Sequence, residues 1–325
     1  MRLLQPLSLI YAALASLNAA MQRARSPGRL ATPVVVVGNL VVGGAGKTPT
    51  VIALVDWLRR EGWQPGVVSR GYGRADDQVL VDVQPDTPAI EAGDEPLLIR
   101  RRTGVPVLVA RDRVAAAQAL LSAHPEVDIV VSDDGLQHHR LPRDVEVLVF
   151  DDRGTGNGLV LPAGPLRQAL PRTLPPQALV LYNASRPSTP LPGSCVRRTL
   201  AAALPLAAWW QGETQACQPL STLAGRPLVA AAGMGAPERF FTMLEQAGLT
   251  IERLPLPDHA DFSPPPWPRD TPDVVVTEKD AVKLTPAGAG ARRVWVVALD
   301  FVLPPDFTAA LQQRLPRRGD ASTPR

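Results

Sequence analysis

The sequence predicts an α/β protein in which a P-loop NTPase-like parallel sheet is followed by a second, smaller α/β unit. Three observations support this class. Short apolar strands alternate with helix-like stretches between residues 34 and 151, a pattern typical of a parallel sheet covered on both faces. Four consecutive valines lead into a glycine-rich turn that ends in Gly46-Lys47-Thr48 and is followed by a helix. A second strand, glycine turn and helix begin at Leu228.

The bulk composition is that of a folded protein with room for about two domains. The chain has 325 residues, of which 45% are hydrophobic and 20% are charged. Its formal net charge of +3 is too small to argue for nucleic-acid binding. The two cysteines, Cys195 and Cys217, have neither metal-ligand nor redox spacing, which favours reduced structural thiols in a cytosolic protein.

The first element is the apolar segment Leu3–Met21, which has arginines on both sides and no acidic residue before Asp56. A cleaved signal peptide would need a longer basic start and would export a nucleotide-binding loop away from ATP. A helix packed on the protein itself, or a membrane-associated helix that spans or lies in the interface, also fits. The arginines that follow favour the membrane, on its cytoplasmic side.

The glycine-rich turn predicts a phosphate-binding loop, although it departs from the usual G-x-x-x-x-G-K-[ST] pattern because Val41 stands where the first glycine should be. Closely spaced glycines still let backbone N–H groups converge on phosphate oxygens at a helix N-terminus. Only three of the 34 basic residues are lysines, and one of them is Lys47, where a compact ammonium suits a polyphosphate. A tight structural turn is the alternative. The expected nucleotide-binding residues are Val41, Val42, Gly43, Gly44, Ala45, Gly46, Lys47 and Thr48.

The other elements of the first unit follow in alternation. Helices are expected over Thr50–Arg60, Gly93–Arg102 and Asp112–Ala123. The expected strands are Gln64–Ser69, Val79–Val83, Val105–Ala110, Val127–Ser132 and Val145–Asp151.

The second unit is separated from the first by residues 183–194, NASRPSTPLPGS, which have the composition of a loop or linker. Its expected elements are a strand and turn over Leu228–Gly235, a helix over Pro237–Ala247, and strands over Asp273–Thr277 and Val294–Leu299. The predicted organisation is an N-terminal membrane-associated helix (1–25), a P-loop domain (26–185), a linker (186–220) and a smaller C-terminal α/β domain (221–325).

Two carboxylates, Asp133 and Asp134, end the apolar run Val127–Ser132. A phosphate-binding loop needs a carboxylate at the end of another strand to hold Mg²⁺, directly or through water. Adjacent carboxylates repel each other, so a cation between them, or a hydrogen-bonded role for one of them, is expected. Gln137 and His138 follow at the same sheet edge, where α/β proteins usually bind ligands. A solvated turn is the alternative for the acidic pair.

Further acids lie at Asp94 and Glu95, where helix capping is an equally simple explanation. His259 stands between Asp258 and Asp261, which suits a general base or a partner that orients one. Thr277-Glu278-Lys279-Asp280 closes an apolar strand and contains another of the rare lysines.

Six motifs in register resemble the tetraacyldisaccharide 4′-kinase family of the lipid A pathway in Gram-negative bacteria, from the N-terminal helix to about residue 300. None of them is decisive alone, but the set in this order is highly specific. They are Gly43-Gly44-Ala45-Gly46-Lys47-Thr48-Pro49, Ser69-Arg70-Gly71-Tyr72-Gly73, Gly93-Asp94-Glu95-Pro96, Asp133-Asp134-Gly135-Leu136-Gln137-His138, Asp258-His259 and Thr277-Glu278-Lys279-Asp280.

The resemblance implies transfer of the ATP γ-phosphate to the 4′-hydroxyl of a tetraacylated disaccharide 1-phosphate, which gives lipid IVA. It also implies two α/β/α domains, joined by a small β linker, with the site between them. By motif, Asp94 matches the proposed catalytic base, working with His259, and Lys47 and Thr48 belong to the phosphate loop. Glu95, Asp133 and Asp134 match the magnesium and phosphate shell. The residues expected to line the cleft are Ser69, Arg70, Tyr72, Gln137 and His138.

The same resemblance places the protein at the cytoplasmic face of the bacterial inner membrane, with a lipid-anchored substrate and no obligate protein partner or nucleic acid. A P-loop ATPase or nucleotide switch of the partitioning type is the main alternative. Such proteins carry a second lysine just before the glycines, and that position here is Val42. A binding module without catalysis would leave Asp94 and His259 unexplained.

Overall fold

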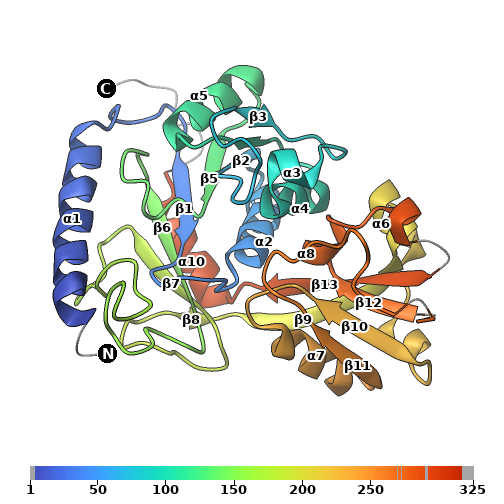
Figure 1. Cartoon of the computed structure of the whole chain (residues 1–325). Coiled ribbons are helices and arrows are strands. Elements are labelled where there is room, and N and C mark those ends of the chain that lie inside the picture. The colour runs from blue at the N-terminus through green and yellow to red at the C-terminus, as the bar shows by residue number, and fades with distance from the viewer. Residues whose placement is uncertain (1–3, 269, 272, 290–291, 317–325) are drawn as a thin grey trace.

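The computed structural model describes residues 4–268, 270–271, 273–289 and 292–316, which form two β-sheets with helices packed on them (Figure 1). The first sheet has the strand order β3-β4-β2-β5-β1-β6-β7-β8, and its neighbouring strands are parallel except for β3 with β4. Its strands are β1 (Val34–Gly38), β2 (Pro65–Ser69), β3 (Val81–Asp82), β4 (Val107–Val109), β5 (Ile129–Asp133), β6 (Val145–Asp151), β7 (Ala178–Asn183) and β8 (Ser194–Cys195).

Helices cover both faces of this sheet, as its continuous apolar strands predict. Val35 and Val37 of β1 belong to the apolar cluster that includes α2 (Lys47–Arg60) and α4 (Asp94–Thr103). The alternate residues Val34 and Val36 belong to a separate cluster with α5 (Arg113–Ala123). Successive side chains of a strand point to opposite faces, so β1 is buried from both sides. The predicted α/β class with a parallel first sheet is confirmed.

The second sheet has the order β11-β10-β12-β13-β9, parallel except where β9 pairs with β13. Its strands are β9 (Arg197–Pro205), β10 (Leu228–Ala232), β11 (Ile251–Pro255), β12 (Asp273–Thr277) and β13 (Arg293–Val302). The remaining helices are α3 (Ala89–Ala92), α6 (Leu206–Gln211), α7 (Pro237–Gln246), α8 (Glu278–Ala281), α9 (Pro286–Ala289) and α10 (Pro305–Arg314), with short 3₁₀ turns η2 (Thr214–Ala216) and η3 (Leu220–Leu223).

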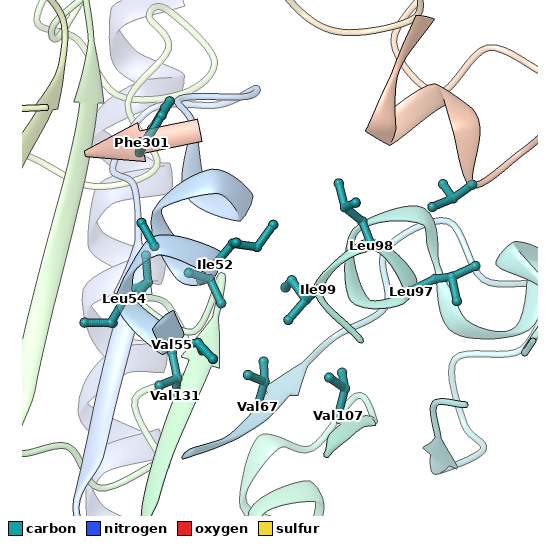
Figure 2. Packing of buried hydrophobic residues seen from close by; sticks show 14 of the residues in the cluster. Ile52, Leu54, Val55, Val67, Leu97, Leu98, Ile99, Val107, Val131 and Phe301 are labelled. Atoms are coloured by element: carbon teal, nitrogen blue, oxygen red, sulfur yellow. The ribbon is translucent and has the colours of Figure 1, made fainter. Parts of the chain in front are cut away.

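One apolar cluster joins the two sheets (Figure 2). Residues of α2 and α4 belong to it, and so does Phe301 of β13 from the second sheet. Val274 and Val276 of β12 also belong to it. The two sheets therefore share a buried interior, and packing fixes the position of any site between them. The labelled members in Figure 2 are Ile52, Leu54, Val55, Val67, Leu97, Leu98, Ile99, Val107, Val131 and Phe301.

The chain crosses between the sheets twice. Residues 186–220, expected as a linker, contain β8 of the first sheet and β9 of the second. Helix α10, inside the expected C-terminal unit, returns to the first sheet and packs on β7, with Arg314 donating to the carbonyl of Pro176 at 2.9 Å. The long strand β13 leads the chain from the second sheet back to α10. The domain boundaries stay a prediction, although the elements do not divide at those residues.

Helix α1 (Gln5–Ala24) lies along the first unit, on the side away from the second sheet (Figure 1). Polar contacts attach it: Ser8 Oγ donates to the Val160 carbonyl at 2.9 Å, and Tyr11 donates to the Arg167 carbonyl at 3.1 Å. Most of its large apolar side chains are exposed, with Leu9 at 74%. Within the described ranges, no helix combines the length and apolar character needed to cross a membrane. The exposed apolar residues of α1 are Leu7, Leu9, Ile10, Leu14, Leu17 and Met21.

Candidate active site

The glycine loop joins β1 to α2 at the carboxyl edge of the first sheet. Gly43 and Gly46 have φ values of 91° and 93°, which only glycine adopts without strain. A Cβ on Gly46 would lie 3.0 Å from Phe301 Cζ and still closer to the Asn183 amide. That amide donates to the Ala45 carbonyl at 3.1 Å, so the loop is held from β7. Glycine at position 46 is therefore required by the local structure.

The absence of a glycine at position 41 has a structural explanation. Val41 does not have a positive φ, and its side chain is buried in the apolar cluster that contains Leu166. The backbone N–H of Val42 donates to the Pro165 carbonyl at 2.9 Å. These residues fasten the start of the loop to the segment at 160–167. Their direct contact with a nucleotide stays a prediction.

Lys47 and Thr48 form the start of α2 and are both buried, with 8% and 7% of their surface exposed. The Lys47 ammonium lies 3.4 Å from Asn39 Oδ1, to which it donates, and 3.9 Å from Asp134 Oδ1. A buried cation and a hydroxyl at a helix N-terminus are the groups that hold a polyphosphate and its metal in a P-loop.

Asp133, the last residue of β5, is almost fully buried and accepts from Ser69 Oγ at 3.0 Å. Burial, together with the nearby carboxylates of Glu95 and Asp134, raises its pKa to about 7, against the opposing effect of Lys47. Its second oxygen, Oδ1, has no hydrogen-bond partner among the described residues. A carboxylate oxygen in this state is suited to a cation.

Asp134 has a φ of 46°, a conformation that aspartate tolerates better than most residues. Its carboxylate accepts from Arg167 at 3.1 Å, which balances part of the acidic charge. No group of three or more histidine, cysteine or acidic side chains that could hold a metal is found in the part of the chain that the structure describes. Mg²⁺ at a P-loop takes most of its ligands from phosphate oxygens and water, so such a group is not needed.

Asp94 begins α4, and its Oδ2 lies 3.1 Å from Nδ1 of His259, which comes from the second unit. Gly93, with a φ of 88°, precedes Asp94, and a Cβ there would lie 3.0 Å from the Gly71 backbone. The ring of Tyr72 lies 5.4 Å from the ring of His259. Residues of three sequence motifs thus meet where the two units face each other.

Two cavities lie beside these groups. One, of about 140 Å³, is lined by Lys47 and Thr48 together with apolar residues of the second unit such as Met234 and Phe240. The other, of about 800 Å³, is larger and polar, and extends to Tyr11 of α1. Glu95, the neighbour of Asp94, lines both. The predicted cleft residues all line the larger cavity: Ser69, Arg70, Tyr72, Gln137 and His138.

The predicted cleft residues differ in their surroundings. Tyr72 is 67% exposed, whereas Gln137 donates to the Asn39 carbonyl at 3.0 Å. Burial lowers the pKa of His138 to about 4, with the positive charge of Arg113 acting in the same direction, so this imidazole is neutral at physiological pH. It is therefore not a source of positive charge for binding phosphate.

Sequence reasoning missed four polar residues of the site: Asn39, Arg153, Arg167 and Asn183. Arg153 donates to the Gly44 carbonyl at 3.0 Å, and Arg167 contacts both Asp134 and Gln137 at 3.1 Å. The two asparagines directly follow or end a strand at the loop edge, which is a usable signal. The two arginines come from the irregular segment between β6 and β7, where no pattern marks them.

Comparison with known proteins gives a consistent answer. The family model described as LpxK, tetraacyldisaccharide-1-P 4′-kinase, matches residues 1–316. The tetraacyldisaccharide 4′-kinase of Methylibium petroleiphilum is 57% identical over 328 residues, covering 97% of this chain and 91% of that protein. That of Leptothrix cholodnii is 52% identical over 321 residues, covering 97% and 92%. A crystal structure of LpxK from Aquifex aeolicus in complex with ATP has a TM-score of 0.75 at 25% identity and covers 96% of this chain and 98% of that one.

Proposed function

The chain belongs to the tetraacyldisaccharide-1-P 4′-kinase family, and from this premise we propose how its residues carry out the transfer. It is a kinase of lipid A biosynthesis that phosphorylates the 4′ position of tetraacyldisaccharide 1-phosphate. ATP is the phosphoryl donor, in keeping with the ATP complex of the related structure. The product of this reaction is lipid IVA.

The observation that carries the mechanism is the Asp94–His259 pair, whose neighbour Glu95 shares a cavity with the glycine loop. Glu95 lines that cavity together with Lys47 and Thr48, so the residue next to the proposed base faces the phosphate loop. Phosphoryl transfer depends mainly on positioning and charge neutralisation, with little covalent chemistry for the protein to do. The Asp94–His259 pair supplies the positioning, and Lys47 supplies the charge neutralisation.

In the proposed reaction, Asp94 accepts the proton of the 4′-hydroxyl as its oxygen forms a bond to the γ-phosphorus. The bond from that phosphorus to the β,γ-bridging oxygen breaks, and ADP leaves with the electron pair. His259, 3.1 Å from Asp94, orients the carboxylate. Lys47 neutralises charge on the phosphates. The residues proposed for Mg²⁺ are Thr48, Glu95, Asp133 and Asp134.

The fit of Mg²⁺ to this site rests on the Asp133 oxygen that has no partner among the described residues, and on the mutual repulsion of the three carboxylates. Hard divalent cations prefer such oxygen ligands. When bound, the metal would neutralise the charge that the phosphates bring to these acids. Asp134 would keep its contacts with Lys47 and Arg167, which hold it beside the phosphate loop.

We also propose that the protein works at the cytoplasmic face of the inner membrane, with α1 lying in the membrane interface. The exposed leucines of α1 support this, because no part of the chain that the structure describes covers them. A substrate with four acyl chains leaves a bilayer only at about 0.8 kcal/mol per CH₂, so the enzyme must reach it there. The larger cavity extends to Tyr11 of α1, which brings the membrane-facing helix to the acceptor.

The test is a phosphorylation assay with purified protein, ATP and tetraacyldisaccharide 1-phosphate in detergent micelles, with the product identified by mass spectrometry. ADP formation should require the acceptor; ADP formation at the same rate without it would support the nucleotide-switch alternative. Asp94→Ala should lower kcat with little change in ATP affinity. A near-wild-type kcat in that variant would remove Asp94 from the role of base.

A further inference from the structure

Lys283, one of the three lysines of the chain, lies just after α8 and has only 11% of its side chain exposed. Its ammonium donates to the Ala260 carbonyl at 2.9 Å and lies 3.3 Å from Asp280 Oδ1 and 3.9 Å from Asp94 Oδ2. We propose that Lys283 is a positioning residue for phosphoryl transfer, holding the Asp94 carboxylate and the His259 loop against each other. The proposal rests on the assignment of Asp94 as the proton acceptor.

The three acceptors around Lys283 come from three different elements. Asp94 begins α4, Ala260 lies in the loop after β11, and Asp280 belongs to α8. A lysine ammonium has three N–H donors that point in different directions, and it can serve three such acceptors at once. A guanidinium is wider and holds its donors in one plane, so it suits acceptors that surround a compact point less well. This geometry explains a lysine in a chain whose basic residues are nearly all arginine.

The loop that carries His259 needs to be held. His259 has a φ of 59°, which a non-glycine residue adopts only when the surroundings enforce it. Ala260 is the next residue, and its backbone is fixed on both sides: its N–H donates to the Pro257 carbonyl at 3.0 Å and its carbonyl accepts from Lys283. The contact with Lys283 thus acts directly on the residue that places the imidazole beside Asp94.

Asp280 anchors Lys283 to the second sheet. It is fully buried and accepts from the backbone N–H of Gly233 at 3.1 Å and from the Thr277 hydroxyl at 2.7 Å. A rigid chain of contacts therefore runs from the ends of β10 and β12 through Lys283 to Asp94 of the first unit. The competing explanation is that Lys283 serves only to balance the buried charge of Asp280, and the experiment separates the two.

The decisive variant is Lys283→Met, which keeps the methylene stem beside the ring of Phe262 and removes the ammonium. We expect kcat to fall on the order of 100-fold, as misplacement of reacting groups by about 1 Å can do, while KM for ATP and for the acceptor changes little. Lys283→Arg should also be impaired, since a wider planar group must replace a compact ammonium in a buried position. In an Asp94→Ala background, Lys283→Met should have almost no further effect on kcat.

The control is the double variant Lys283→Met and Asp280→Asn. The second change removes the buried carboxylate that Lys283→Met leaves without its cation, and asparagine has the same shape as aspartate. The melting temperature of the double variant shows whether the fold is recovered. The proposal predicts that kcat stays low in this pair; a return to wild-type kcat would mean that Lys283 only balances Asp280. Wild-type kcat in Lys283→Met, or an equal loss in the Asp94→Ala background, would also overturn it. If Asp94→Ala itself keeps kcat, the base assignment and this inference both fail; if only Lys283→Met keeps it, the inference alone fails.

Discussion

Replacing Gly46 with alanine should destabilise the nucleotide site by an amount that the structure allows one to estimate. The φ of 93° at this position costs a residue with a side chain about 1–2 kcal/mol. The new Cβ would lie 3.0 Å from Phe301 Cζ and would displace the Asn183 amide, whose hydrogen bond to Ala45 contributes about 1 kcal/mol. The free energy of unfolding should therefore fall by about 2–3 kcal/mol.

Thermal unfolding followed by circular dichroism measures this effect. At about 2–4 °C per kcal/mol for a unit of this size, the melting temperature of Gly46→Ala should drop by about 4–12 °C. Because Lys47 follows directly, calorimetric titration should also show weaker ATP binding.

Gly44→Ala is the matched control in the same loop. A Cβ at Gly44 would meet no atom of the described residues within 4 Å, and the φ of Gly44 is outside the left-handed region, so this variant should have the melting temperature of the wild type. If Gly46→Ala melted together with Gly44→Ala, the local structure would not require glycine at position 46 and the reasoning above would be refuted.

Three further predictions follow from the same structure. Lys47→Ala should lower kcat on the order of 10²–10³-fold in the micelle assay, because it removes a preorganised charge from the transferring phosphoryl, and a smaller loss than tenfold would contradict this role. Burial and the charge of Arg143 lower the pKa of His139 to about 4 from 6.5, so the unfolded chain takes up a proton below pH 6.5 that the folded protein refuses until about pH 4. Stability should fall as pH drops through that window, and His139→Gln should make the melting temperature less dependent on pH there; an unchanged slope would count against the shifted pKa. Replacing Leu9 and Leu14 of α1 with glutamine should reduce co-sedimentation with anionic vesicles while ATP affinity stays the same, and undiminished co-sedimentation would argue against α1 as the membrane contact.

The sequence predicts the strands and helices near the glycine loop well, because their side-chain patterns are local. The expected strand Val145–Asp151 matches β6, and the expected helix Gly93–Arg102 differs from α4 by one residue at each end. Strand β9 is a different case. It lies in the expected linker, and its partly buried residues Arg197–Pro205 pair along their length with the distant strand β13, which no local pattern reveals.

In the site, too, local motifs predict some contacts, whereas contacts between distant parts of the chain were not predictable from spacing. Motifs at the carboxyl ends of strands place Lys47, Asp133 and Ser69 at one sheet edge, and Ser69 does contact Asp133. The pairing of Asp94 with His259 spans 165 positions and two units, so no spacing within the chain reveals it. The resemblance to a family predicted that pair. Neither a local sequence pattern nor the resemblance pointed to Arg167.

The two crossings of the chain between the sheets determine how the active-site cleft can open. A unit joined by one flexible connection can rotate about it in any direction. Here strands β9 and β13 pair as an antiparallel ribbon as far as Arg197 and Val302, so the outgoing and the returning chain are bonded to each other. The second unit is therefore tied to the first by two hydrogen-bonded chain segments as well as by the shared apolar cluster, and both restrict any widening of the gap between Asp94 and His259.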